Sequence, residues 1–425
     1  MKNVTALLAC VLLAGCGPRG PKEGFAPIDP EAAVFWDRQT TETAELLQQL
    51  AADFNASWKE GPPLKVERSG GYDEIFRKTS ASIRAHVLPS MAVCYENMTA
   101  QYIPTGAVRA LDEYMRDAQT GFSQSELDDF FPAVLETNRY AEFGGKMYSF
   151  PFTKSVLMMY FNKAVLAKAG FDRPPDTWDE FLAQCRAVKA KTGKFAYAVN
   201  PDCSTIDGMI FSRGGEVYAD GKARFDSPES IAVFELYETL AKEGLAYQIS
   251  AAFDDEIAFS KDDVAFTFRT GSGRIHVAAL MQDRMDQWGL VRIPQADPAH
   301  PRTVLYGGNI CLFNTTPEQA RTAWAFVKYF TSKETMVRWA LGTGYLPFRR
   351  SVADDPAVKD LWAQWPYSRA SFDCLDFARP EPNIRGWQEV REVVAKALRQ
   401  VLDGNLTGRE AAAALQRQTE ELLKR

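Results

Sequence analysis

The sequence predicts an α/β protein with two lobes, and three observations lead to this fold class. The chain has 425 residues, more than a single hydrophobic core usually serves, so we expect two cores. Hydrophobic residues make up 46% and charged residues 24% of the chain, which is the balance of an ordinary folded protein. Short apolar runs alternate with segments of helical periodicity, and this alternation favours parallel strands connected by helices.

The first 32 residues have the pattern of an export signal followed by a tether. Lys2 precedes the apolar run 6–14, which is too short to span a bilayer. Residues 13–16 read Leu-Ala-Gly-Cys and resemble the lipobox of bacterial lipoproteins. The resemblance implies a signal peptide over residues 1–16 and a lipid on Cys16; an ordinary cleaved signal with an incidental cysteine is the alternative, and both export the protein. Residues 17–32 contain four prolines, which is typical of an extended tether.

A β-α-β unit opens the first lobe. The apolar run 34–36 and the segment 64–67 are strand candidates, and residues 41–54 between them carry apolar side chains at helical spacing. A further apolar strand ends at Glu96. Ligands of parallel sheets bind beyond the carboxyl ends of the strands, where Tyr72 and Glu96 fall.

The chain is expected to cross between the lobes more than once. The apolar run 156–161 predicts one crossing, and residues 342–347 fit a second. We expect an N-terminal lobe of residues 33–148 with 306–342, and a C-terminal lobe of residues 149–305 with 343–425. Later helices are predicted at 163–169, 177–192, 228–243, 273–281, 317–330, 332–341, 385–402 and 407–423, and later strands at 196–199, 264–268 and 303–306.

The chain lacks the motifs of the commonest enzymes, metal sites and nucleic-acid binders. None of its three histidines lies in HExxH, and neither a GxSxG elbow nor a P-loop is present. The net charge is −6, without a basic block interleaved with aromatics. Residues 271–273 read Gly-Ser-Gly before a predicted helix, where free backbone N–H groups could meet an anion or a hydroxyl, or form a plain turn.

Five cysteines follow Cys16, and their pattern favours buried thiols. They form an odd number without a CxxC pair, so metal binding gets no support. One or two disulfides are possible in an exported protein, but small buried thiols fit most of these positions better. The five are Cys94, Cys185, Cys203, Cys311 and Cys374.

Stretches spread in order over nearly the whole chain carry a family resemblance. They include residues 70–73, 88–96, 102–112, 149–180, 307–308 and 343–347. Together they resemble the family 1 extracellular solute-binding proteins of ABC importers, especially the binders of glycerol-3-phosphate and glycerophosphodiesters. The resemblance implies a periplasmic-binding-protein-like fold, in which two α/β lobes joined by hinge crossings close on a ligand. It also implies docking of the closed form on a membrane permease, no cofactor, and action as a monomer.

The resemblance also implies a set of ligand-binding residues. Glu96 would accept ligand hydroxyls, and Arg391 presents a rigid fork suited to a phosphate. Gly308 would let a backbone N–H approach the ligand. Tyr72 and Tyr345 offer flat faces with polar tips, although they could simply pack at the hinge, and Arg391 could only pair with a carboxylate. The residues that the resemblance implies are Tyr72, Glu96, Ser155, Thr270, Ser272, Gly308, Tyr345 and Arg391, and Lys154 beside Ser155 is a ninth candidate.

Two departures from the family pattern bear on the ligand. Lys154 precedes Ser155 and could strengthen an anion site or face solvent. No tryptophan occurs near residues 200–205, where these binders have an aromatic platform. We favour a glycerol-3-phosphate-like ligand only slightly over a sugar or polyol.

Two other functions were weighed against transport. A sensor that reports ligand occupancy to a membrane receptor would share the same cleft. An exported carbohydrate- or phosphodiester-cleaving enzyme would need paired carboxylates, for which Glu96 and Asp73 are the candidates. The sequence favours a non-enzymatic binding protein, held through Cys16 as a periplasmic or cell-surface lipoprotein.

Overall fold

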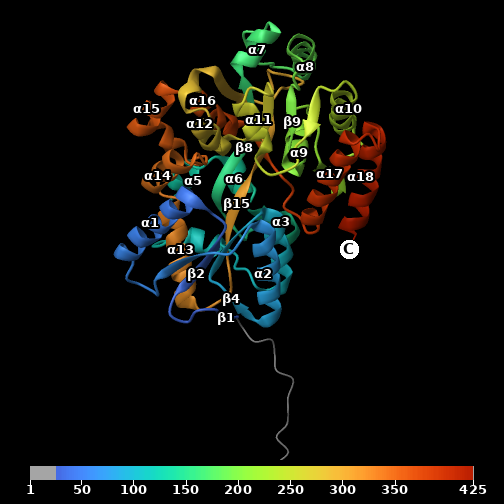
Figure 1. Ribbon diagram of the computed structural model, residues 1–425. Helices are drawn as coiled ribbons and strands as arrows, with labels where there is room; N and C mark the ends of the chain where they lie inside the picture. Colours follow the sequence, from blue (N-terminus) through green and yellow to red (C-terminus); the bar gives the residue numbers. More distant parts are fainter. Residues whose placement is uncertain (1–24, 425) are drawn as a thin grey trace, which may run out of the picture.

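The structure is a computed structural model that describes residues 25–424. Its centre is a ten-stranded sheet, in which eight strands follow the order β12-β9-β13-β8-β15-β5-β2-β3 and β14 and β16 pair with β8 and β15. Helices surround this sheet in two lobes that meet along β8 and β15 (Figure 1). The predicted two-lobed α/β fold is confirmed, but the sheet is mixed rather than parallel. The expected signal peptide, Cys16 and most of the tether lie outside the described residues.

The N-terminal lobe contains the predicted β-α-β unit. Strands β2 (Ala33–Asp37) and β3 (Leu64–Arg68) pair in parallel and are connected by α1 (Thr41–Ser57). Every side chain of β2 is buried, which explains its apolar run. Figure 1 shows α1 and α13 on one side of this part of the sheet and α2 and α3 on the other. The lobe's other elements are β1 (Ala26–Pro27), α2 (Tyr72–Ala85), β4 (Val87–Leu88), β5 (Met91–Cys94), α3 (Glu96–Tyr102), α4 (Asp112–Arg116), α5 (Gln124–Asp128), α6 (Pro132–Glu136), β6 (Arg139–Tyr140) and β7 (Lys146–Met147).

Two long antiparallel strands carry the chain between the lobes. These are β8 (Phe150–Asn162), whose residues are all buried, and β15 (Thr303–Leu312). The strand predicted at 303–306 therefore continues through the glycines that follow it. Gly307 has φ +116°, and a Cβ there would lie 2.0 Å from the carbonyl oxygen of Thr153. Only glycine fits this close approach of the two crossing strands.

The part of the sheet in the C-terminal lobe contains both parallel and antiparallel strand pairs. Strands β9 (Tyr197–Val199), β12 (Ala246–Gln248) and β13 (Phe266–Thr270) are mutually parallel, whereas β13 and β14 (Trp288–Arg292) run antiparallel to β8. Thr177 caps α8 by accepting a hydrogen bond from the N–H of Glu180 at 3.2 Å. The lobe's other elements are α7 (Lys163–Ala169), α8 (Trp178–Thr192), α9 (Cys203–Phe211), β10 (Tyr218–Ala219), β11 (Lys222–Ala223), α10 (Pro228–Lys242), α11 (Asp254–Ser260) and α12 (Arg274–Leu280).

The last third of the chain returns to both lobes. Helix α13 (Pro317–Phe330) covers β2 and β15 in the N-terminal lobe, and α14 (Lys333–Thr343) packs on α1. Residue Leu346 then bridges to Lys154 of β8, at the second predicted crossing. The final elements are α15 (Pro356–Gln364), α16 (Tyr367–Asp373), β16 (Ala378–Pro380), α17 (Trp387–Leu402) and α18 (Gly408–Leu423).

Two large hydrophobic cores hold the molecule together. The first spans both lobes, since it joins Phe35 of β2 to Met158 of β8 and Phe372 of α16. The second fills the outer side of the C-terminal lobe, around Tyr197 and Trp387. All five cysteines from Cys94 to Cys374 are free and buried. Within residues 25–424, no helix combines the length and apolar character needed to cross a membrane.

Candidate ligand-binding cleft

A cleft of about 510 Å³ lies between the lobes, and both lobes and the crossing segments line it. The residues from the N-terminal lobe follow the carboxyl ends of β2, β3 and β5. Sheets of this kind place ligand sites at such strand ends. The lining includes Arg38, Gln39, Thr40, Thr41, Tyr72 and Tyr95 on one side, Asn200, Asp202, Ser204, Thr205, Glu256, Arg269, Thr270, Ser272 and Arg391 on the other, and Ser155, Gly307 and Tyr345 from the crossings.

Aromatic rings and guanidinium groups form a layered wall in the cleft. The rings of Tyr72 and Tyr95 stack with centroids 4.0 Å apart. The guanidinium of Arg38 lies 4.8 Å from the Tyr72 centroid, and that of Arg391 lies 5.0 Å from the Tyr95 centroid. Cation–π contacts of this kind fix the positions of both guanidinium groups. Tyr345 closes this wall, because its hydroxyl accepts a hydrogen bond from Arg38 at 3.4 Å.

A cluster of hydroxyl groups faces this wall from the C-terminal lobe. The hydroxyls of Thr270 and Ser272 lie 2.8 Å apart. Thr270 caps the short 3-10 turn Gly271–Gly273, and Ser155 accepts from the backbone N–H of Ser272 at 3.3 Å. The Gly-Ser-Gly turn thus brings three predicted residues from two chain segments together. Their hydroxyls can donate to and accept from a polar ligand.

Arg391 is paired with two carboxylates. It donates to the buried Glu381 and lies 3.7 Å from Asp202. It also donates to the hydroxyl of Ser204 at 3.2 Å. Burial acts to lower the pKa of Arg391, but Glu381 outweighs it, so the pKa lies well above its usual range. Arg391 is therefore a fixed cation whose charge is already balanced within the protein.

Comparison with known proteins identifies the family to which this chain belongs. The family model of bacterial extracellular solute-binding proteins matches residues 49–365. The chain belongs to the bacterial extracellular solute-binding proteins. Members of this family that serve ABC importers bind solutes and are not enzymes, and the chain is such an exported binding protein.

Relatives of this solute-binding protein are similar over nearly their whole length. The sn-glycerol-3-phosphate-binding periplasmic protein UgpB of Escherichia coli K12 is 23% identical over 414 residues, which cover 92% of each chain. The structure of UgpB from Mycobacterium tuberculosis with glycerophosphocholine superposes with a TM-score of 0.80 at 20% identity, over 92% of this chain and 98% of that one. The GacH receptor of Streptomyces glaucescens, solved without ligand and with acarbose, gives 0.78 at 21% identity, over 94% and 99%. These structures share the two-lobed fold.

The cleft of this solute-binding protein contains six of the nine predicted ligand residues. These are Tyr72, Ser155, Thr270, Ser272, Tyr345 and Arg391. By our predicted division the two tyrosines come from different lobes, and the two serines come from the same, C-terminal lobe. Near residues 200–205 the lining consists of polar side chains rather than an aromatic platform.

The structure does not place Glu96, Lys154 and Gly308 in the cleft lining. Glu96 is 0% exposed, and its carboxylate accepts from the side-chain amide of Asn309 at 3.0 Å. Lys154 faces neither solvent nor the cleft, because it is fully buried and donates to the carbonyl of Gly307 at 3.2 Å. We expected Glu96, and Lys154 as an alternative to facing solvent, to meet the ligand; in this structure their hydrogen bonds go to residues of β15.

Gly308 contributes space rather than a ligand contact. Its N–H donates to the hydroxyl of Thr153 at 3.2 Å, so it is not free for a ligand. A Cβ at this position would lie 2.7 Å from the hydroxyl of Tyr72. Glycine is therefore required here for Tyr72 to reach its place in the wall.

The sequence prediction missed the loop that follows β2. Arg38, Gln39 and Thr40 line the cleft directly beyond the carboxyl end of this strand. The strand-end rule that selected Tyr72 would have selected them too, because the run 34–36 was recognised as a strand. Asp202 and Ser204 were also missed; both lie at the start of α9, after the end of β9.

A buried cluster behind Arg391 contains possible metal ligands. Ligand atoms of Cys203, Asp207 and Glu381 lie within 4.8 Å of one another. Burial raises the pKa values of Cys203 and Asp207 well above their usual ranges, and a charged Glu381 nearby raises that of Asp207 further. In the absence of an ion, protons on Cys203 and Asp207 and the guanidinium of Arg391 therefore limit the negative charge of this cluster.

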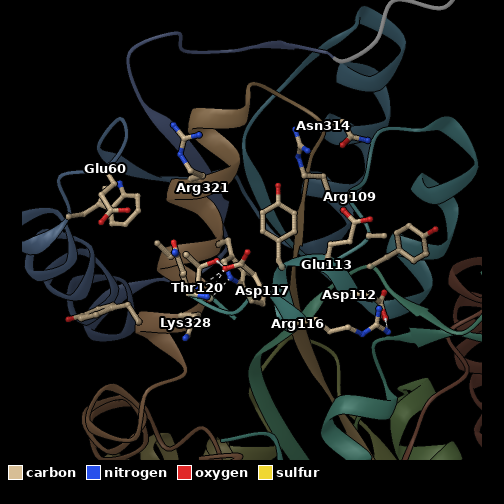
Figure 2. Close-up of a pocket in the computed structure, with 18 of the residues that line it drawn as sticks. Glu60, Arg109, Asp112, Glu113, Arg116, Asp117, Thr120, Asn314, Arg321 and Lys328 are labelled. Carbon is tan, nitrogen blue, oxygen red and sulfur yellow. Dashed lines mark hydrogen bonds and ion pairs between the residues drawn. The ribbon is translucent and has the colours of Figure 1, made fainter. Parts of the chain in front are cut away.

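A larger hollow of about 1170 Å³ lies elsewhere on the N-terminal lobe. Figure 2 shows its charged rim, with Arg109, Glu113, Asp117 and Arg321 among the labelled side chains. Glu113 lies on α4, Asp117 directly follows this helix, and Arg321 lies on α13. All its lining residues fall in our predicted N-terminal lobe, between Phe54 and Tyr148 or between Asn314 and Tyr329. Movement of one lobe against the other cannot enclose a ligand there. The smaller cleft between the lobes fits the family's binding mode better.

Proposed function

We propose that this protein captures a small polar solute between its lobes and delivers it to the permease of an ABC importer. The observation that carries this proposal is the cleft of about 510 Å³, which both lobes line. A cavity of this volume suits a ligand of one or two sugar units, and closing the lobes would exclude water from it. The polar side chains of the lining can supply many hydrogen bonds to such a ligand.

The ligand we propose is a sugar, a polyol or a glycerophosphate compound. The hydroxyl cluster around Ser272 and the rings of Tyr72 and Tyr345 suit the polar edges and apolar faces of such molecules. The name of the E. coli relative specifies sn-glycerol-3-phosphate, the M. tuberculosis relative was solved with glycerophosphocholine, and one related structure is named as a cyclic alpha-maltosyl-1,6-maltose binding protein. Both classes therefore belong in the first ligand panel.

A thermal-shift panel with small-angle scattering tests the function. The purified protein is heated with sn-glycerol 3-phosphate, glycerophosphocholine, glycerol, maltose and galactose. A true ligand at about 100 times its Kd stabilises the folded state by about 2.7 kcal/mol and raises the melting temperature. The same ligand should also make the molecule more compact in solution. A protein that neither shifts nor closes with any member of the panel would falsify the proposal for these ligand classes.

We also propose that the protein is a lipoprotein anchored through Cys16, in the periplasm or at the cell surface. Residues 13–16 support this proposal because they match the lipobox pattern. Mass spectrometry of the N-terminal peptide should find Cys16 as the first residue, carrying acyl chains. A Cys16→Ala variant should be found in the soluble fraction. An unmodified peptide that begins at another residue contradicts the anchor and leaves the solute-binding function untouched.

We assign the moving bodies to residues 33–148 with 306–342 and residues 149–305 with 343–425, acting as a monomer. Three segments support this division, since β8, β15 and residues 342–347 pass between these bodies side by side. Hydrogen exchange should show that ligand slows exchange at these crossings and at the cleft rim. Protection confined to one lobe would contradict the assignment. Sedimentation at micromolar concentration tests the monomer.

A further inference from the structure

Three arginines line the cleft, and only one of them lacks an acidic partner. Arg391 is paired with Glu381 and Asp202, as described above. Arg269 is paired with Asp255 at 2.6 Å and with Glu256 at 3.0 Å. Within the described residues 25–424, no carboxylate oxygen lies within 4 Å of the Arg38 guanidinium. Arg38 is therefore the cleft arginine that makes no ion pair in this part of the chain, and the carboxylate of its neighbour Asp37 interacts with it only at longer range.

The contacts of Arg38 hold it in place without forming an ion pair. Among residues 25–424, the one side-chain hydrogen bond of Arg38 goes to the hydroxyl of Tyr345 at 3.4 Å, and the face of its guanidinium lies over the ring of Tyr72. Its Nε is buried without a hydrogen-bond partner. An unmade hydrogen bond of a buried charged group is costly, so this donor is poised for an acceptor that enters the cleft.

A second donor beside Arg38 points to the same kind of ligand. The side chain of Gln39 is 4% exposed, lines the cleft, and has an amide nitrogen without a partner. The carboxylate of Asp37 does not satisfy it, since Asp37 accepts from the backbone N–H of Gln39 instead, at 2.6 Å. Two neighbouring side chains therefore present unused donors to one part of the cleft.

The first turn of α1 adds to this part of the cleft. The helix has 17 residues, and its N-cap, Thr40, makes no side-chain capping bond. Thr40, Thr41 and Thr43 line the cleft, so the positive end of the helix faces it. Glu42, the acidic residue of this turn, is exposed and is not part of the lining. The loop and the helix start thus offer charge, N–H donors and hydroxyls together.

We propose that the solute is an anion whose phosphate or carboxylate group binds to Arg38, Gln39 and the first turn of α1. This inference rests on the proposed solute-binding function and narrows its ligand class. It places the anionic group on the N-terminal lobe, away from the Arg391 fork that the sequence suggested. The uncharged part of the ligand then lies toward the hydroxyl cluster of Thr270 and Ser272.

Calorimetric titration with matched pairs of ligands tests the inference. The first pair is sn-glycerol 3-phosphate and glycerol, and the second is galacturonate and galactose. The anion of at least one pair should bind, and Arg38→Gln should weaken it by about 10- to 100-fold, the loss of one hydrogen bond to a charged group. Binding of the first anion identifies a phosphate site, and binding of the second a carboxylate site.

Two further variants separate charge from general damage. Arg38→Lys keeps the charge but loses the planar stack on Tyr72, so its affinity should fall between those of the other two proteins. Arg321→Gln removes an arginine charge from the same lobe outside the cleft and should change affinity by less than about threefold. Melting curves without ligand check that each variant is folded.

Two results would overturn the inference. The first contradicts the anion site alone, and the second also contradicts the proposed solute-binding function. If a neutral sugar binds and its anionic partner does not, or if Arg38→Gln weakens both equally, the anion site is wrong while the solute-binding function remains. If no member of either pair nor of the earlier panel binds, both proposals fail together.

Discussion

Buried charges beside the crossing strands stabilise each other rather than a ligand. Lys154 is fully buried, and burial lowers its pKa while the nearby Glu96 acts to raise it. The carboxylate of Glu96 is held in turn by Asn309. A buried charge is tolerated when an opposite charge is near. Removal of one partner leaves the other charge buried without compensation, which destabilises the folded state.

A double-mutant cycle tests this coupling. We expect Glu96→Gln to lower the free energy of unfolding by about 3 kcal/mol, because Lys154 is left buried without its opposite charge. The double variant Glu96→Gln with Lys154→Met should recover part of the loss. Urea unfolding of the four proteins measures both effects. Simple addition of the two losses would show that the residues are independent, and a loss of ligand affinity without loss of stability would restore Glu96 to the ligand site.

Asp37 gives the protein a specific dependence of stability on pH. Burial raises its pKa to about 6 from the ordinary value of 3.8, against the hydrogen bonds from the backbone that lower it. The folded state therefore holds this proton more tightly than the unfolded state. Its contribution to stability is full below about pH 4, is lost as the pH rises toward 6, and stays lost above that.

Asp37→Asn should remove this dependence, because the amide does not titrate. Compared with the wild type, the variant should gain about 3 kcal/mol of stability between pH 4 and pH 7, if its oxygen still accepts from Gln39. Unfolding midpoints measured at pH 4, 5, 6 and 7 give the difference between the two proteins. A constant difference over this range would mean that Asp37 does not titrate there.

At the scale of elements, β15 depends on a backbone conformation that only glycine adopts easily. Gly307 has φ +116° and lies directly against the carbonyl of Thr153 on β8. Gly106 also has a positive φ, +72°, but its missing Cβ would point into open space. Alanine variants of the two glycines therefore distinguish the energetic cost of the positive φ from the cost of the contact between β15 and β8.

Gly307→Ala should be more destabilising than Gly106→Ala. The second change costs about 1–2 kcal/mol, the usual price of a left-handed residue with a Cβ. The first should cost at least about 2 kcal/mol more, because the crossing strands must move apart to remove a contact of 2.0 Å. Chemical unfolding measures both losses. Equal losses would show that the strands adjust freely at this point.

The sequence predicted the elements well because their signals are local. The helices expected at 163–169 and 317–330 have those bounds, since apolar spacing and flanking residues define them. The environment of Glu96 could not be predicted in this way. Its partner Asn309 lies 213 residues away, and only the pairing of β5 with β15 brings them together. The environment of Arg391 could not be predicted from local signals either, because its partner Ser204 lies 187 residues away in the sequence.

At the scale of the whole molecule, the two lobes share both a sheet and a core. Strand β8 contributes buried residues along its whole length and pairs with strands of both lobes. The first hydrophobic core continues from Phe35 to Phe372 without a break between the lobes. Unfolding of one lobe would expose apolar surface of the other lobe to water, which is unfavourable. We therefore expect that neither lobe is stable without the other.

We therefore expect the protein to unfold in one cooperative transition despite its two lobes. Scanning calorimetry should show a single peak whose calorimetric and van't Hoff enthalpies agree. Because a ligand in the cleft binds both lobes, it should move the whole peak to higher temperature, by the equivalent of about 2.7 kcal/mol at 100 times its Kd. Two peaks, of which the ligand moves only one, would show that the lobes unfold separately and that the shared sheet does not couple them.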